Sequence, residues 1–396
     1  MKRVVFVLSI IISSLSATSI EELVNSSFSR NYDLKGLEKS IEVANYQIKL
    51  AKNWENPMLE FKTNMIMLNK NYLNDQKEYG VELSQAIPIG NRLDIEESIA
   101  KKDKDIQEIL LEDKKLELES KIYSYSYNIL ILENRLKLLE EYKKNQDKLE
   151  NLYSKLYKYK KANFNDVLNT QISKYDIDIQ INELKTTIEN LYLNLEIITY
   201  VKIDNLNGNL ELKNIDKTIE ENSFYTHPQI KILELTNQRY KDYAKLEESK
   251  KFSSITLSLE YMQNKEQDYA NVSIGMPLPI YKTENINKLK ANLNANEIND
   301  RQKSQIHNLK LQTKIYLNNL EKSKQNYKII QERIIPLKLK LQKVLENRVI
   351  FEKANLEESI NNLNELIDYE IKANEELAKY FENYSELIYY SNKGTI

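Results

Sequence analysis

Few residues in this chain could carry chemistry. Its 396 residues include two histidines, His227 and His307, and no cysteine. The histidines lie in different predicted helices, so a histidine metal site is not expected, while disulfides, thiolate metal sites and a thiol nucleophile are excluded. The sequence also contains no nucleotide-binding loop, G-x-S-x-G elbow or zincin motif. We therefore expect a protein that is not an enzyme and that has no cofactor and no metal centre.

The composition favours long, solvated helices. Charged residues make up 29% of the chain, and it has only 6 Gly and 6 Pro, which is too few turn formers for a compact protein with many strands. The 57 basic and 59 acidic residues are mixed along the sequence, so no basic surface for nucleic acid and no polybasic membrane patch is visible.

The N-terminus resembles a secretory signal peptide. Lys2 and Arg3 precede the apolar run 4–12, and small and polar residues follow up to Ala17. This layout predicts a signal peptide over residues 1–17 with cleavage after Ala17. An uncleaved anchor is the alternative, although the apolar run is short for crossing a bilayer.

The sequence contains an internal duplication. Residues 31–35 (NYDLK), 85–89 (QAIPI) and 159–164 (YKKANF) are echoed in order by three later segments, 227–231 (HPQIK), 276–280 (MPLPI) and 351–356 (FEKANL). We infer two structural repeats, 18–205 and 206–396, each with the order helix, hairpin, long helix, turn, helix. Such copies must bury their apolar faces against each other or against other chains.

The long helices carry seams typical of coiled coils. Mostly apolar residues recur every three or four positions over 306–344, and over 122–159 with one slip between 142 and 149. A helix from about residue 92 to 159 would measure on the order of 100 Å. Pro336 interrupts the second seam, where Lys144 stands in the first, and is expected to kink its helix or remove a backbone hydrogen bond.

Two segments alternate with period two instead. Residues 59–65 and 255–261 read as strands, and 79–84 and 272–276 supply their hairpin partners. Isolated hairpins are marginal and leave edges exposed, while a membrane barrel needs about eight strands. Three chains would supply twelve strands. A soluble hairpin packed on its own helices is the alternative.

Several motifs together resemble the TolC-type outer-membrane efflux proteins. They are 54–59 (WENPML), 85–92 (QAIPIGNR), 227–229 (HPQ), 275–280 (GMPLPI) and the pair 335–336 (IP). The resemblance implies a mostly α fold with a small β part. Long coiled-coil helices would form a trimeric α-helical barrel, and four strands per chain would contribute to a twelve-stranded transmembrane β-barrel.

The resemblance also implies a function. The chain would be the outer-membrane channel, or exit duct, of a tripartite efflux or type I secretion system in a Gram-negative bacterium. It would be a passive homotrimeric conduit through the outer membrane lipid and the periplasm, docking on a periplasmic adaptor (membrane fusion) protein and an inner-membrane pump. The alternative is a secreted periplasmic coiled-coil scaffold whose hairpins cap the helices.

The resemblance also assigns the two faces of each strand to different environments. Apolar residues such as Leu59 and Leu257 would face lipid, and their alternating neighbours would face a watery lumen. Alternation alone would look similar in any half-buried sheet. The predicted lumen residues are Glu60, Lys62, Glu82, Ser258 and Glu260.

The resemblance places adaptor docking at the two helix turns. Ala162 and Ala354 stand where the family usually has Gly, so Asn163 and Asn355 are expected to adopt the left-handed conformation. The docking candidates are Lys160, Lys161, Ala162, Asn163, Lys353, Ala354 and Asn355.

Acidic residues follow each turn. In the family such acids face the pore, which makes Asp166, Glu357 and Glu358 the pore and gate candidates. In a trimer each would form a ring of three that attracts cations. The alternative is that they are acids in the first turn of a helix, where they favour its dipole.

Overall fold

The computed structural model describes residues 18–64, 78–213, 215, 221–252, 254–264, 267–349 and 355–391. The chain divides into two compact units. The first contains the described residues of 1–32, 114–223 and 309–396, and the second contains those of 33–113 and 224–308. Each unit thus draws on both sequence repeats. The predicted signal peptide, residues 1–17, lies outside the described residues.

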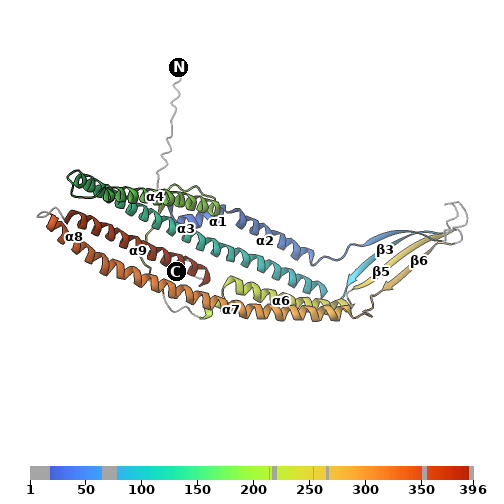
Figure 1. Ribbon diagram of the computed structural model, residues 1–396. Coiled ribbons are helices and arrows are strands. Elements are labelled where there is room, and N and C mark those ends of the chain that lie inside the picture. Colours follow the sequence, from blue (N-terminus) through green and yellow to red (C-terminus); the bar gives the residue numbers. More distant parts are fainter. Residues whose placement is uncertain are drawn as a thin grey trace, which may run out of the picture. The chain divides into compact units, whose positions relative to one another are not determined.

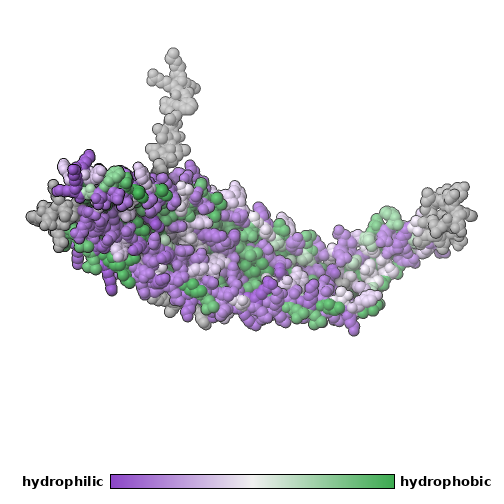
Figure 2. Space-filling view, viewed as in Figure 1, coloured by the Kyte–Doolittle hydropathy of each residue, from purple (hydrophilic) through white to green (hydrophobic). Residues whose placement is uncertain are grey.

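Helices dominate both units (Figure 1), which confirms the predicted mostly helical fold. On the face drawn in Figure 2 the helices are mostly hydrophilic, as the high charge content requires. No helix within the described residues is both long and apolar enough to cross a membrane. The main helices are α1 (Ile20–Arg30), α2 (Tyr32–Leu50), α3 (Arg92–Lys158), α4 (Phe164–Thr199), α5 (Glu221–Tyr225), α6 (Pro228–Ser249), α7 (Thr283–Ile329), α8 (Ile335–Val349) and α9 (Asn355–Tyr390).

The first unit is built around α9. Tyr380, Phe381 and Tyr384 of this helix are at most 1% exposed. The Phe381 ring stacks on Tyr127 of α3 with ring centres 4.0 Å apart, and Ser120 of α3 donates a hydrogen bond to the α9 backbone at 2.7 Å. Buried aromatic pairs of this kind contribute about 0.5–1.5 kcal/mol beyond their area. The C-terminal helix is therefore the core of this unit.

Two short strands hold the beginning of the described chain. β1 (Thr18–Ser19) pairs in parallel with β4 (Leu206–Asn207), which lies in the connection after α4. Ser19 also caps α1, because its hydroxyl accepts from the Glu22 N–H while the Glu22 carboxylate accepts from the Ser19 N–H. The start of α1 is thus fixed both by pairing and by capping.

Pro336 is preceded by a π-helical segment, η3 (Ile330–Ile334). Proline has no N–H and its ring crowds the carbonyl four residues earlier, here Glu332. The Ile335 N–H donates to the carbonyl of Ile330, five residues back, so the wider turn accommodates the proline while the helix continues. The predicted disturbance at Pro336 is therefore present as a local widening.

Four strands of the second unit form one antiparallel sheet. They are β2 (Met58–Asn64), β3 (Glu78–Pro88), β5 (Ser254–Asn264) and β6 (Tyr269–Gly275), in the order β2-β3-β5-β6. Each predicted hairpin is present. The pairing of β3 with β5, from Glu78 opposite Asn264 to Pro88 opposite Ser254, joins the two hairpins and was not anticipated from the sequence.

Helices of the second unit pack through a small apolar cluster and ion pairs. Ile95 and Ile99 at the start of α3 contact Leu246 of α6. Beside them, buried Asp242 of α6 forms ion pairs with Lys102 of α3 at 2.6 Å and with Lys245 of α6 at 2.9 Å. Burial is the largest single influence on the Asp242 pKa and raises it, but the hydrogen bonds from both amines and from the Ser98 hydroxyl together lower the pKa below its usual value. The ammonium partner compensates for burying this carboxylate.

Gly80 of β3 has no room for a side chain. A Cβ there would lie 2.0 Å from Sδ of Met262 and 2.5 Å from the carbonyl oxygen of Tyr261 on the neighbouring strand. Met262 itself is fully buried. Glycine at this position lets β3 and β5 approach with Met262 between them.

We therefore predict that Gly80→Ala destabilises the sheet by about 1–3 kcal/mol, because the backbone must shift to accept the methyl group. Urea unfolding of the purified protein in detergent, followed by circular dichroism, measures this loss. Gly275→Ala is the matched control, since nothing lies within 4 Å of its added Cβ. Equal midpoints for the two variants would contradict the assigned contact.

Candidate functional site

One face of the sheet gathers charged residues. Glu82 lies opposite both Glu60 and Glu260, which places three carboxylates in one row across the strands. Lys62 forms ion pairs with Glu82 and, at 3.1 Å, with Glu260, and Asn271 donates to Glu260 at 2.8 Å. Three carboxylates facing one ammonium leave this row net negative.

The remaining predicted lumen residue, Ser258, lies on the same face. It is opposite Ser84 of β3 and Ser273 of β6, so a row of hydroxyls follows the row of carboxylates. All five predicted residues are therefore brought together on one side of the sheet. Whether that side encloses a lumen depends on other copies of the chain.

The opposite face is apolar and open. Its side chains include Phe61 at 81% exposure, Val272 at 70% and Ile274 at 73%. Leu83 and Leu259 are opposite each other on this face and are also exposed. An exposed apolar surface of this kind marks contact with lipid or with another protein.

Both outer strands of the sheet are edges. Among the described residues, β2 pairs only with β3, and β6 pairs only with β5. Each edge strand therefore has a row of backbone groups without a partner strand in the described part of the chain. In a hydrocarbon environment such groups must be satisfied by another strand.

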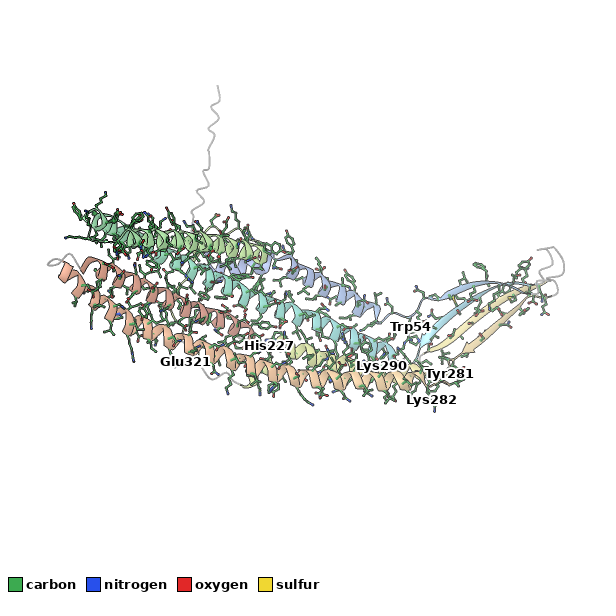
Figure 3. The ribbon with its side chains drawn as sticks, viewed as in Figure 1. Trp54, His227, Tyr281, Lys282, Lys290 and Glu321 are labelled. Atoms are coloured by element: carbon green, nitrogen blue, oxygen red, sulfur yellow. The ribbon has the colours of Figure 1, made fainter. Side chains whose placement is uncertain are left out.

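Aromatic and basic residues mark the end of the sheet where the strands join the helices. Trp54 precedes β2, and Tyr281 and Lys282 follow β6; all three lie at this end (Figure 3). Trp54 is 56% and Tyr281 88% exposed. Exposed Trp and Tyr are enriched at the boundary between membrane and water.

The first helix turn ends α3 in a Schellman motif. The Lys161 N–H donates to the Leu156 carbonyl at 2.8 Å, and the Lys160 N–H donates to the Tyr157 carbonyl at 2.9 Å. Lys160 has a φ of 57°, so it is the left-handed residue. The prediction that Asn163 takes this conformation is wrong, because its φ is −85°.

Asn163 instead begins α4. Its N–H donates to Oδ2 of Asp166 at 3.0 Å, and the Asp166 N–H donates to the Asn163 carbonyl at 3.1 Å. Asp166 thus serves as a first-turn acid that caps the helix. Its predicted place in a pore stays a prediction, and Lys160, Lys161 and Ala162 occupy the turn as expected.

At the second turn, Lys353 and Ala354 lie outside the described residues, and Asn355 is the first residue of α9. Glu357 and Glu358 are exposed in the first turn of α9. The Tyr153 hydroxyl donates to Glu357, and burial, this bond and the nearby Asp166 raise the pKa of Tyr153. Two of the three gate candidates therefore lie near the same tyrosine of α3.

Three polar residues of α9 were not singled out from the sequence. Asn361, Asn364 and Asp368 line a groove with residues of α3 and α4 in the first unit. Their spacing of three and four residues along one helix face was the available signal. Within the described residues, no group of three His, Cys, Asp or Glu side chains is arranged to hold a metal ion.

Comparison with known proteins finds a family that matches part of the chain. Residues 23–199 match the sequence model of a family described as outer membrane efflux protein. These residues contain the first hairpin, the beginning of α3 that follows it, the Schellman turn and α4. Over these residues the chain has the sequence pattern of an outer membrane efflux protein. A search of curated proteins found no match.

The fold extends this similarity to the second repeat. The outer membrane channel CmeC of Campylobacter jejuni is 14% identical, with a TM-score of 0.78 over 95% of this chain and 86% of its own. The open state of the Neisseria gonorrhoeae channel MtrE is 13% identical, with a TM-score of 0.78 over 95% of this chain and 89% of its own. At these identities the likeness concerns the fold.

The family match and the structural neighbours together confirm several predictions. This outer membrane efflux protein is a channel of the outer membrane that extends into the periplasm, as expected. It is a transport protein and not an enzyme. The periplasmic scaffold hypothesis is accordingly set aside.

We predict that Lys160→Gly stabilises the first turn by about 0.5–1 kcal/mol. Glycine avoids the Cβ clash of a left-handed residue, roughly 1–2 kcal/mol, which exceeds its extra entropy cost in the unfolded chain. Hydrogen exchange at residues 156–163 of the efflux protein measures the change locally.

Lys158→Gly is the control for this prediction, because Lys158 is the last residue of helix α3 and glycine weakens a helix. Its exchange should accelerate where that of Lys160→Gly slows. Faster exchange in both variants would contradict the left-handed assignment of Lys160.

Proposed function

We propose that three copies of this chain assemble into one channel, each copy contributing its four strands to a closed barrel of twelve. The unpaired edges of β2 and β6 carry this proposal. Pairing β2 of one copy with β6 of the next satisfies both edges in every copy, and closure removes the last free edge.

The two faces of the sheet support the same assembly. In a closed barrel the apolar face with Phe61 and Val272 meets lipid, and the face with Glu60, Lys62, Glu82, Ser258 and Glu260 lines the lumen. Trp54 and Tyr281 then lie at the membrane boundary on the periplasmic side, next to the helices.

Exposed apolar stripes on the helices favour trimerisation as well. On α4, Leu168, Ile172, Tyr175 and Ile179 are at least 39% exposed and follow each other at steps of three and four residues. Such a stripe on the surface of a single chain is the kind that a neighbouring helix covers in a coiled-coil barrel. The repeats 18–205 and 206–396 would give this tube sixfold pseudosymmetry.

At its other end, the tube docks on a periplasmic adaptor that connects it to an inner-membrane pump. The docking residues are those of the two turns, Lys160 to Asn163 and Lys353 to Asn355. The carboxylates of Asp166, Glu357 and Glu358 line the pore and restrict passage through it. Support comes from the family and from the clustering of Asp166 and Glu357 near Tyr153. The leader 1–17 is removed after Ala17 during export.

The edge pairing is tested by disulfides, since the chain has no natural cysteine. Phe61→Cys in β2 is combined in turn with cysteine at Ala270, Val272 or Ile274 of β6. We expect one pair to give a covalent trimer on a non-reducing gel, because only one register brings the two sulfurs within bonding distance.

In the control, the β6 cysteine is replaced by Leu257→Cys in the central strand β5, which should give no linkage. A trimer held by the control pair, or no linkage with any of the three edge pairs, would contradict the proposed pairing.

The facing of the strands is tested with single cysteines at Val272 and Ser273. Both residues are exposed in β6 but point to opposite faces of the sheet. In outer membranes, a charged maleimide should label Ser273→Cys, and a lipid-soluble maleimide should label Val272→Cys. Equal labelling of the two positions by the charged reagent would refute the barrel.

A further inference from the structure

A polar groove lies between α3, α4 and α9 in the first unit. Its volume of about 460 Å³ is within the range of small-molecule sites. Each helix contributes one face, with residues spaced by three or four positions. The lining residues are Tyr142, Gln146, Leu149 and Tyr153 of α3, Asp166, Asn169, Thr170 and Ser173 of α4, and Asn361, Asn364, Glu365 and Asp368 of α9.

The same three helices are packed with apolar residues farther from their turns. Leu139, Ile177 and Ile181 form a buried cluster there, and Ile371 of α9 packs against it. Following each helix face toward its turn, carboxylates, amides and hydroxyls replace these apolar side chains. Helix bundles are stabilised by burying apolar residues at such positions. Polar residues there therefore contribute less to the stability of the bundle than apolar ones would.

Asn364 is the clearest sign that the groove is built for a ligand. The residue is 7% exposed, and its Oδ1 atom has no hydrogen-bond partner in the part of the chain that the structure describes. The nearby buried Asn362, by contrast, donates to Gln342 at 2.9 Å. A buried acceptor left without a donor destabilises the folded protein unless a ligand supplies the donor.

Asp368 lies one helical turn beyond Asn364 on the same face of α9. No ion pair or hydrogen bond engages its carboxylate among the described residues. Burial and then the Asp368 charge raise the pKa of Tyr142 across the groove. The other two acids are partly engaged, Asp166 in the helix cap and Glu365 with Lys338.

The chemistry of the lining selects a donor-rich cation. None of the lining residues is basic, and carboxylates, amide oxygens and hydroxyls supply acceptors on all three walls. Protonated amines donate charge-assisted hydrogen bonds to such groups. A bare metal ion fits less well, because the described residues include no cluster of three ligating side chains.

We infer that this groove binds one linear polyamine, or a similarly elongated organic cation with several amino groups, in each chain. One ammonium group pairs with Asp368, an adjacent N–H satisfies Asn364 Oδ1, and a second ammonium group reaches toward Asp166. Bound in this way, the cation ties α9 to α3 and α4 near their turns. The site is complete within one chain, so it does not depend on the trimer.

Isothermal titration of the purified full chain in detergent with spermidine tests the inference. We expect one spermidine per chain, and a Kd that rises about tenfold or more in Asp368→Asn, which removes the charge and keeps the shape. Asp176→Asn is the matched control, because Asp176 is exposed on α4 outside the groove. It should bind as the natural chain does.

Asn364→Leu separates a ligand site from a merely structural residue. Leucine has a similar size and removes the unpaired acceptor, so the ligand-free protein should unfold at the same or a higher temperature while spermidine binding weakens. Absence of binding, or unchanged binding in both Asp368→Asn and Asn364→Leu, would overturn the inference. Tighter binding of Mg²⁺ than of spermidine, lost in Asp368→Asn, would overturn the organic cation as well.

Discussion

The unpaired edges of the sheet are the constraint on which the rest of the structure depends. Within the described residues, β2 and β6 each have one neighbouring strand, and no strand in this part of the chain pairs with their outer backbone groups. Water can satisfy such groups, but lipid does not. In the proposed trimer, neighbouring copies pair with both edges, and the alternation of apolar and charged residues along the strands suits a sheet with lipid on one face and water on the other.

Local sequence patterns predicted the helices and strands and their order, because hydrophobic periodicity and turn-forming residues depend only on neighbouring residues. The period of two located the strands, and the helix expected from about residue 92 begins at Arg92. The pairing of β3 with β5 was beyond such reasoning. It joins residues from different repeats, and its register depends on Gly80 making room for Met262, which no local pattern reveals.

The turn after α3 shows that residue type alone does not predict which residue adopts the left-handed conformation. Asn163 tolerates the left-handed conformation better than Lys160 does, yet Lys160 adopts it. The helix ends where the carbonyls of Leu156 and Tyr157 receive their bonds, which fixes the left-handed position, and Asn163 is needed three residues later to begin α4. Likewise, the groove around Asn364 required knowing which three helices meet.

The two repeats are alike in order but differ in how their helices can bend. In the first repeat, α3 is α-helical throughout its 67 residues. In the second repeat, the π-helical segment η3 interrupts the equivalent helix just before Pro336. Such wider turns are a recognised cause of helix bending. Ile330 and Ile335 still pack on Leu366 of α9, so the interruption is held by side chains more than by its backbone. Separating α9 from α8 would therefore have to break these side-chain contacts at the widened turn, a feature that the uninterrupted α3 of the first repeat lacks.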